Sequence, residues 1–89
     1  MPQLQYFYYY NGNIYKKSET LPVLECIDTD ESYGFSSYEN ALYLLQECQN
    51  LIGKNSLSFN EDFLEENRTI LDNVQILPSN DPLIVQLCR

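Results

Sequence analysis

The sequence predicts an α+β fold, in which a small sheet of about four to five mostly antiparallel strands packs against one main helix and a second short helix. Two observations favour this class. Aromatic and β-branched residues dominate residues 4–27, and from residue 36 onward apolar residues recur at helical spacing. The 89 residues, of which 44% are hydrophobic, suffice for one modest core. We therefore expect a single globular domain over residues 1–89.

The first expected element is an N-terminal β-hairpin. Asn11-Gly12 separates two β-prone runs, and this dipeptide accepts the positive φ angles of a type I′ turn. Side chains alternate along a strand, so both faces of the hairpin carry aromatic residues. One face has Leu4, Tyr6, Tyr8 and Tyr10, and the other has Gln5, Phe7 and Tyr9.

A bend and a third strand are expected after the hairpin. Residues 18–22 have the polar and proline composition of a bend. Residues 23–27 are a short apolar run with β-branched residues at both ends, which is typical of a strand. This strand is expected to extend the same sheet.

The main helix is expected at about residues 37–52. Apolar residues recur there at three- and four-residue steps, the signature of an amphipathic helix. Ser36 and Glu39 have the spacing of a capping box at its start, and Gly53 suits its end. This helix should cover one face of the sheet.

A second, shorter helix is expected to begin after Asn60, whose side chain can cap it. Acidic residues in its first turn interact favourably with the helix dipole. Near residue 74 the pattern changes to the alternation of a strand. Residues 78–82 have the composition of a turn, and residues 83–87 form a short apolar run of the kind that a buried terminal strand shows.

The charge balance favours a larger protein with a basic surface as the partner. Thirteen acidic residues against five basic ones give a formal net charge of −8, and the basic residues are dispersed along the chain. Because such a field repels phosphate, we expect no direct binding of nucleic acid and no binding to an anionic membrane. Acidity also keeps a small protein soluble, so net charge alone specifies neither the site nor the oligomeric state.

The residue types argue against an enzyme. The chain has no histidine, which removes the commonest general base, the Ser–His and Cys–His nucleophile pairs and most zinc sets. Its three glycines are isolated, so no phosphate-binding loop is present. A pair of carboxylates could act as acid and base, but a chain of this length has little room for a substrate cleft. We expect no catalytic residues and no cofactor.

A cytoplasmic location is expected. The N-terminal residues lack a basic leader, and no run of about 18 apolar residues occurs. The three cysteines are widely spaced and odd in number, which favours reduced thiols over disulfides.

Two surfaces are candidates for binding a partner, and the first is acidic. Four carboxylates occupy neighbouring turns of the expected second helix: Glu61, Asp62, Glu65 and Glu66. Pairs four residues apart repel each other on a helix, and arginine or lysine on a partner would relieve that repulsion. The simpler alternative is a solvated helix face.

The second candidate is the tyrosine row Tyr6, Tyr8 and Tyr10. If the helices cover this face, the tyrosines are part of the core; if they cover the other face, the tyrosines are exposed. Exposed tyrosine suits a protein interface because it combines a large apolar area with a hydroxyl group and few rotatable bonds. Stacking on single-stranded nucleic acid would need more accompanying cations than Lys16 and Lys17.

Residues 28–39 raise an alternative, a calcium loop. Counted from Asp28, the EF-hand ligand positions fall on Asp28, Asp30, Ser32 and Glu39. The sixth position is Tyr33 instead of the required glycine, and the preceding segment is strand-like instead of helical. We therefore expect no metal site and interpret the segment as an acidic loop between a strand and a helix.

These observations favour a small acidic, non-catalytic protein-binding module that occupies a basic surface of a larger protein and inhibits or regulates it. In size and charge it is analogous to small acidic phage and mobile-element proteins that inhibit nucleic-acid enzymes, sometimes as nucleic-acid mimics. One alternative is a small-ligand or calcium-responsive domain that uses residues 28–39. Another is a structural subunit of a larger assembly whose aromatic sheet face is buried at an interface.

Overall fold

The computed structural model describes residues 4–27 and 34–87. Its sheet has four antiparallel strands in the order β3-β2-β1-β4. The strands are β1 (Tyr6–Tyr10), β2 (Asn13–Lys17), β3 (Leu24–Ile27) and β4 (Gln75–Pro78). The helices are α1 (Tyr38–Lys54), the 3-10 turn η2 (Ser56–Ser58), α2 (Glu61–Asn73) and α3 (Pro82–Leu87). The predicted α+β class is confirmed.

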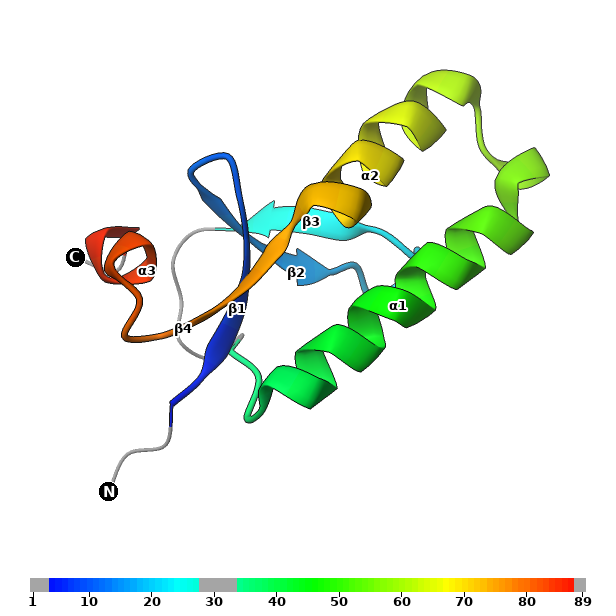
Figure 1. Ribbon diagram of the computed structural model, residues 1–89. Coiled ribbons are helices and arrows are strands. Elements are labelled where there is room, and N and C mark those ends of the chain that lie inside the picture. The colour runs from blue at the N-terminus through cyan, green and yellow to red at the C-terminus, as the bar shows by residue number, and fades with distance from the viewer. Residues whose placement is uncertain (1–3, 28–33, 88–89) are drawn as a thin grey trace.

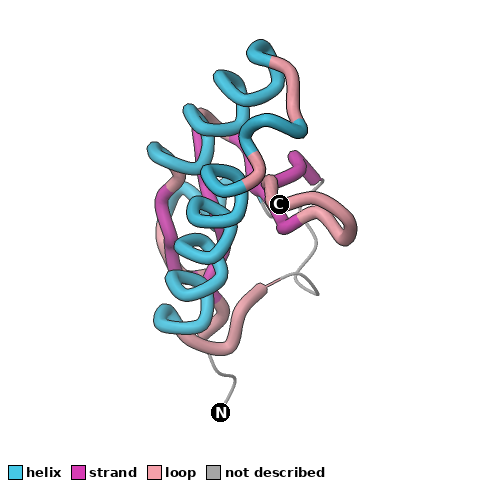
Figure 2. The backbone as a smooth tube through the Cα atoms, turned by 90° about the vertical axis from the view of Figure 1, so that its right-hand side faces the viewer, coloured by secondary structure: helices cyan, strands magenta, loops and turns pink. Residues whose placement is uncertain are grey.

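The helices lie on both faces of the sheet. Helices α1 and α2 run side by side along one face and are joined through η2, whereas α3 lies on the opposite side of the strands (Figure 1). Seen from the side, the α1–α2 pair forms a layer in front of the strands (Figure 2). Both faces of the aromatic hairpin are therefore covered, at least in part.

The predicted hairpin is confirmed. Asn11 has φ 49° and Gly12 has φ 86°, the two positive angles that a type I′ turn requires. The turn sets the register of the strands, which pairs Tyr10 with Asn13 and Tyr8 with Tyr15. Because paired residues share a face, Tyr8 and Tyr15 lie on the same side of the sheet.

The bend before β3 depends on one buried serine. Ser18 is 3% exposed, and its Oγ accepts hydrogen bonds from the amides of Thr20 (3.3 Å) and Leu21 (3.2 Å). The Ser18 amide donates to the carbonyl of Val23 at 2.9 Å. These bonds close the bend predicted at residues 18–22 and direct the chain into β3.

The boundaries of α1 differ slightly from those predicted. Its N-cap is Ser37, whose Oγ accepts from the Asn40 amide at 3.1 Å, so Ser36 and Glu39 do not form the expected capping box. At the other end Gly53 is still helical, and Asn55 caps the helix by donating its backbone amide to the Leu51 carbonyl. Two adjacent serines are both possible N-caps, and residue spacing in the sequence does not distinguish between them.

The predicted second helix and the strand after it are confirmed. The Asn60 side chain accepts a hydrogen bond from the amide of Phe63 at 2.7 Å and so caps α2. Helix α2 continues to Asn73, and β4 begins two residues later beside β1. Long-range pairing with β1 therefore brings residues 75–78 back into the sheet beside the N-terminal hairpin.

The predicted terminal strand at residues 83–87 is wrong, because this segment is the short helix α3. The Asp81 carboxylate accepts from the Leu83 amide at 2.9 Å, and the Asp81 carbonyl accepts from the Val85 amide. Pro82 stands at the first helical position, where its fixed φ fits and its missing amide costs nothing. A short apolar run does not by itself distinguish a strand from one turn of buried helix.

The larger core lies between the sheet and the α1–α2 pair. Tyr8 is completely buried there, and its hydroxyl donates to the carbonyl of Ala41 in α1. Helix α1 contributes its predicted apolar stripe, namely Ala41, Leu45, Cys48 and Ile52. The hydrogen bond supplies a partner for the one polar atom that Tyr8 brings into this core.

The smaller core lies under α3. Phe7 and Ile14 of the hairpin are each 2% exposed, and Ile84 of α3 is fully buried against them. Leu87 of α3 also packs against this cluster, but Ile84 is the one fully buried side chain of the six-residue helix.

Replacing Ile84 by alanine is expected to lower the free energy of unfolding by about 2–4 kcal/mol, the usual cost of removing a buried aliphatic side chain. Val85 is 43% exposed on the same helix, so Val85→Ala is the matched control and should change stability by less than about 0.5 kcal/mol. Urea unfolding followed by far-UV circular dichroism measures both. Equal midpoints for the two variants would contradict the packing of α3 on the sheet.

Stability is expected to fall at alkaline pH. Burial raises the pKa of the Tyr8 phenol and the pKa of the Cys48 thiol above their ordinary values. The unfolded chain therefore releases these protons first, near its ordinary pKa values of about 8.5–10, and stability is lost as the pH rises above them. Urea midpoints at pH 7.5 and pH 10.5 test this. Tyr8→Phe should lose less stability over that interval, and an equal loss would contradict the assignment to Tyr8.

Candidate functional site

A groove lies between the turn end of the hairpin and α2. Its volume is about 450 Å³, within the range of binding pockets for small ligands. We call it the tyrosine groove, and it is lined by Tyr10, Tyr15, Asp62, Glu65, Glu66, Thr69 and Ile70. Two segments about fifty residues apart in the sequence thus form one site.

The hairpin supplies the aromatic wall of the groove. Tyr10 ends β1 and Tyr15 lies in β2, and their ring centroids are 6.3 Å apart with the planes inclined by 55°. Both rings are half-buried. Tyr15 also packs against the larger core, so this wall is held in place by the sheet.

Helix α2 supplies the acidic wall. Its apolar residues Phe63, Leu64 and Leu71 pack toward the core, which turns the carboxylates of Asp62, Glu65 and Glu66 outward. All three carboxylates belong to exposed residues. A helix packed along one stripe necessarily presents the opposite face to solvent, and here that face is acidic.

The electrostatics of the groove favour a cation. Helix α2 carries five carboxylates against one guanidinium. Burial is the main reason that the pKa of the Tyr15 phenol is raised, and Cys26, Tyr10 and Glu66 nearby raise it further. The phenol is therefore neutral at physiological pH and offers a hydroxyl donor next to carboxylate acceptors.

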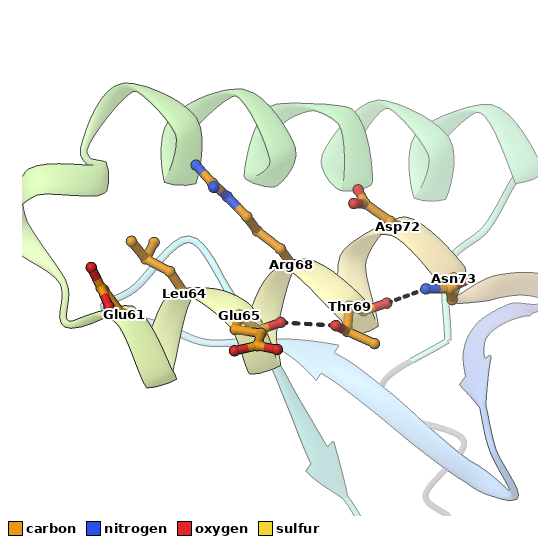
Figure 3. A pocket seen from close by; sticks show the side chains of 7 residues that line it. All are labelled: Glu61, Leu64, Glu65, Arg68, Thr69, Asp72 and Asn73. Carbon is orange, nitrogen blue, oxygen red and sulfur yellow. Dashed lines mark hydrogen bonds between the residues drawn. The ribbon is translucent and has the colours of Figure 1, made fainter.

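A second hollow of about 460 Å³ lies on an adjacent face of α2. Figure 3 shows the side chains that line it. It is lined by Glu61, Leu64, Glu65, Arg68, Thr69, Asp72 and Asn73, and we call it the Arg68 hollow. In Figure 3 the Arg68 side chain extends from α2 toward α1. The Thr69 hydroxyl donates to the Glu65 carbonyl at 2.9 Å, and the Asn73 amide group donates to the Thr69 carbonyl at 2.7 Å.

Helix α2 is thus a ridge between two hollows of different charge. Glu65 and Thr69 line both of them. The lining of the Arg68 hollow includes a cation, whereas the lining of the tyrosine groove, over the residues that the structure describes, has carboxylates and no basic side chain. A positively charged ligand is therefore attracted more strongly to the tyrosine groove.

The structure brings together part of each predicted surface. Asp62, Glu65 and Glu66 line the tyrosine groove with Tyr10, while Glu61 lines the Arg68 hollow. These five residues remain candidates for contact with a partner. Parts of two surfaces that the sequence suggested separately therefore meet in one groove.

Tyr8 and Tyr6 lie elsewhere. Tyr8 is fully buried under α1, so in this fold it cannot contact a partner, which corrects its assignment as a binding residue. Tyr6 is half-buried beside Tyr38 of α1, with ring centroids 6.2 Å apart. Helix α1 packs against the row at Tyr8 and Tyr6, whereas Tyr10 lies at the turn end beside α2. Tyr6 is only half-buried and stays a predicted contact residue.

Tyr15 is a groove residue that the sequence reasoning missed. The signal was available, because a two-residue type I′ turn at Asn11-Gly12 pairs Tyr8 with Tyr15 and so places Tyr15 on the tyrosine face. Thr69 and Ile70 carried no such signal, since their place in the groove depends on how α2 packs across the hairpin.

The calcium hypothesis remains a prediction. Asp28, Asp30 and Ser32 lie outside the described residues, and Glu39 is exposed in the first turn of α1. Over residues 4–27 and 34–87, no group of three or more histidine, cysteine, aspartate or glutamate side chains is placed to hold a metal ion. In the same part of the chain, no helix combines the length and the apolar character needed to cross a bilayer.

No protein-family model, no curated protein and no solved structure matches the chain.

Proposed function

We propose that the protein is a small non-catalytic binding module that docks on a basic surface of a larger protein through α2 and the tyrosine groove, and thereby inhibits or regulates that protein. The observation that carries this proposal is the meeting of Tyr10 and Tyr15 with Asp62, Glu65 and Glu66 in one groove. Acidic side chains attract a basic partner, and the tyrosines supply apolar area that excludes water at the contact.

Charge and aromatic area have different roles in such an interface. Exposed carboxylates chiefly accelerate association and are screened by salt. Half-buried tyrosine side chains are already largely ordered in the free protein, so they lose little conformational entropy when a partner covers them. The combination supports an interface that forms quickly with a basic surface and is held by the aromatic residues at its centre.

A nucleic-acid enzyme is the partner that this surface fits best. Glu61 with Glu65, and Asp62 with Glu66, place carboxylates four residues apart, about 6 Å along the helix axis. A row of negative charges on a rigid helix can occupy a channel whose basic side chains normally hold phosphates. Occupation of that channel would exclude the nucleic acid and inhibit the enzyme without any chemistry by this chain.

The proposal is tested by recovering the partner and measuring its activity. The purified protein is immobilised and used to capture proteins from a lysate of its native host at about 50 mM salt, with elution near 500 mM salt. Mass spectrometry identifies what elutes, and the activity of that enzyme is measured with and without one equivalent of this protein. We expect an enzyme that acts on nucleic acid and is inhibited. A captured enzyme whose activity does not change would contradict the proposed inhibition.

A further inference from the structure

We propose that the tyrosine groove accepts a single arginine side chain of the partner and prefers it to lysine. This inference rests on the proposed function and adds the residue type that the groove selects. It depends on the shape and lining of one groove, and not on the acidity of α2 alone.

The lining has two chemically different walls. Tyr10 and Tyr15 present inclined aromatic rings on the hairpin side, and Ile70 adds an apolar contact at the base of α2. Glu65 and Glu66 lie on the helix side with Asp62 one turn earlier. A ligand that matches both walls needs an apolar stem, a flat face for the rings and several donors for the carboxylates.

Arginine has this combination, and lysine has only part of it. The guanidinium is planar, stacks on aromatic rings and donates two parallel hydrogen bonds to one carboxylate. An ammonium group is a compact, strongly hydrated charge without a flat face. Both side chains are attracted electrostatically by the carboxylates of the groove. Stacking on the tyrosine rings is therefore the interaction that gives arginine a higher affinity than lysine.

The Arg68 hollow offers a contrast within the chain. It is lined by Arg68 together with Glu61, Glu65 and Asp72, and its described lining includes no aromatic residue. Arg68 does not line the tyrosine groove, and its side chain extends toward α1 (Figure 3). The tyrosine groove therefore combines carboxylates that can pair with a guanidinium and an aromatic wall on which it can stack. Among the described residues, its lining contains no cation.

The test is a titration with short peptides that contain one basic residue. The probes are acetyl-Gly-Arg-Gly-amide and acetyl-Gly-Lys-Gly-amide at about 50 mM salt, added to the full chain and followed by backbone amide shifts in two-dimensional NMR. We expect saturable shifts at Tyr10, Tyr15, Glu66 and Thr69, and affinity roughly two- to fivefold higher for the arginine peptide.

Two matched pairs of variants identify the walls. Tyr10→Leu should bring the arginine affinity down to that of lysine, whereas Tyr43→Leu should not, because Tyr43 is 69% exposed on α1 and lies outside the groove. Glu66→Gln should weaken the binding of both peptides. The control Glu47→Gln should change the binding of neither. Tyr10 is half-buried at the strand end and belongs to neither core cluster, so Tyr10→Leu should remain folded.

Equal affinity for the two peptides would overturn the inference. So would a Tyr10→Leu variant that still binds the arginine peptide more tightly than the lysine peptide. Shifts confined to residues outside the groove would overturn it as well. None of these results would by itself contradict docking on a basic protein, which the capture experiment and its salt dependence decide separately.

Discussion

Replacing Tyr8 by alanine is expected to lower the free energy of unfolding by about 3–5 kcal/mol, the usual cost of deleting a buried aromatic side chain. Tyr8 is completely buried between the sheet and α1, and its hydroxyl donates to the Ala41 carbonyl. The substitution leaves a cavity beneath α1 and removes that bond. Since a small domain has only about 5–15 kcal/mol of stability, the variant should be close to unfolding at 37 °C.

Two further variants separate packing from hydrogen bonding. Tyr8→Phe keeps the ring and loses the hydroxyl, so its cost should be about 1 kcal/mol. Tyr43→Ala removes an exposed tyrosine of α1 and should cost less than about 0.5 kcal/mol. Urea unfolding of the three proteins orders them, and a Tyr8→Ala midpoint equal to that of Tyr43→Ala would contradict the buried position of Tyr8.

Reversing two charges on α2 is expected to weaken binding to the basic partner by roughly a hundredfold or more, because like charges placed together at an interface cost several kcal/mol. Glu65→Lys with Glu66→Lys changes two exposed residues in the middle of α2 that both line the tyrosine groove. Neither lies in the first turn, so the helix dipole is little affected. Isothermal titration calorimetry with the captured partner measures the change.

The matched control reverses two carboxylates elsewhere. Glu19 lies in the bend before β3 and Glu47 is on α1, and both are exposed and outside the two hollows. Glu19→Lys with Glu47→Lys alters the net charge by the same amount as the α2 variant. It should reduce affinity only through weaker long-range attraction, by less than about tenfold. A loss equal to that of the α2 variant would show that net charge, and not the groove, determines binding.

Local chemistry explains what could be predicted about the fold. The Asn11-Gly12 turn, the helical stripe that includes Ala41 and Leu45, and the Asn60 cap are each specified within a few residues of sequence. Their structures therefore agree with the prediction. The start of α1 differs by one residue, where two serines compete for one cap, and its end differs by two residues, where Asn55 and not Gly53 ends the helix.

Long-range packing explains what could not be predicted. Asp81 supplies a local cap for the helix at residues 83–87. Its apolar face is buried by packing of Ile84 on Phe7 and Ile14, which are distant in sequence, so the apolar run alone did not distinguish this helix from a strand. The candidate site also depends on long-range packing. Its carboxylates were visible in the sequence, but their place in one groove with Tyr10 and Tyr15 depends on how α2 packs beside the sheet.

The most direct test of docking through the tyrosine groove is a side-by-side capture from the native host lysate at about 50 mM salt. The wild-type chain, the Glu65→Lys/Glu66→Lys variant and the Glu19→Lys/Glu47→Lys control are compared, and bound proteins are quantified by mass spectrometry. We predict one basic partner that the wild type and the control retain and the α2 variant loses. Equal retention by all three proteins, or no specific partner on the wild type, would contradict the proposed function.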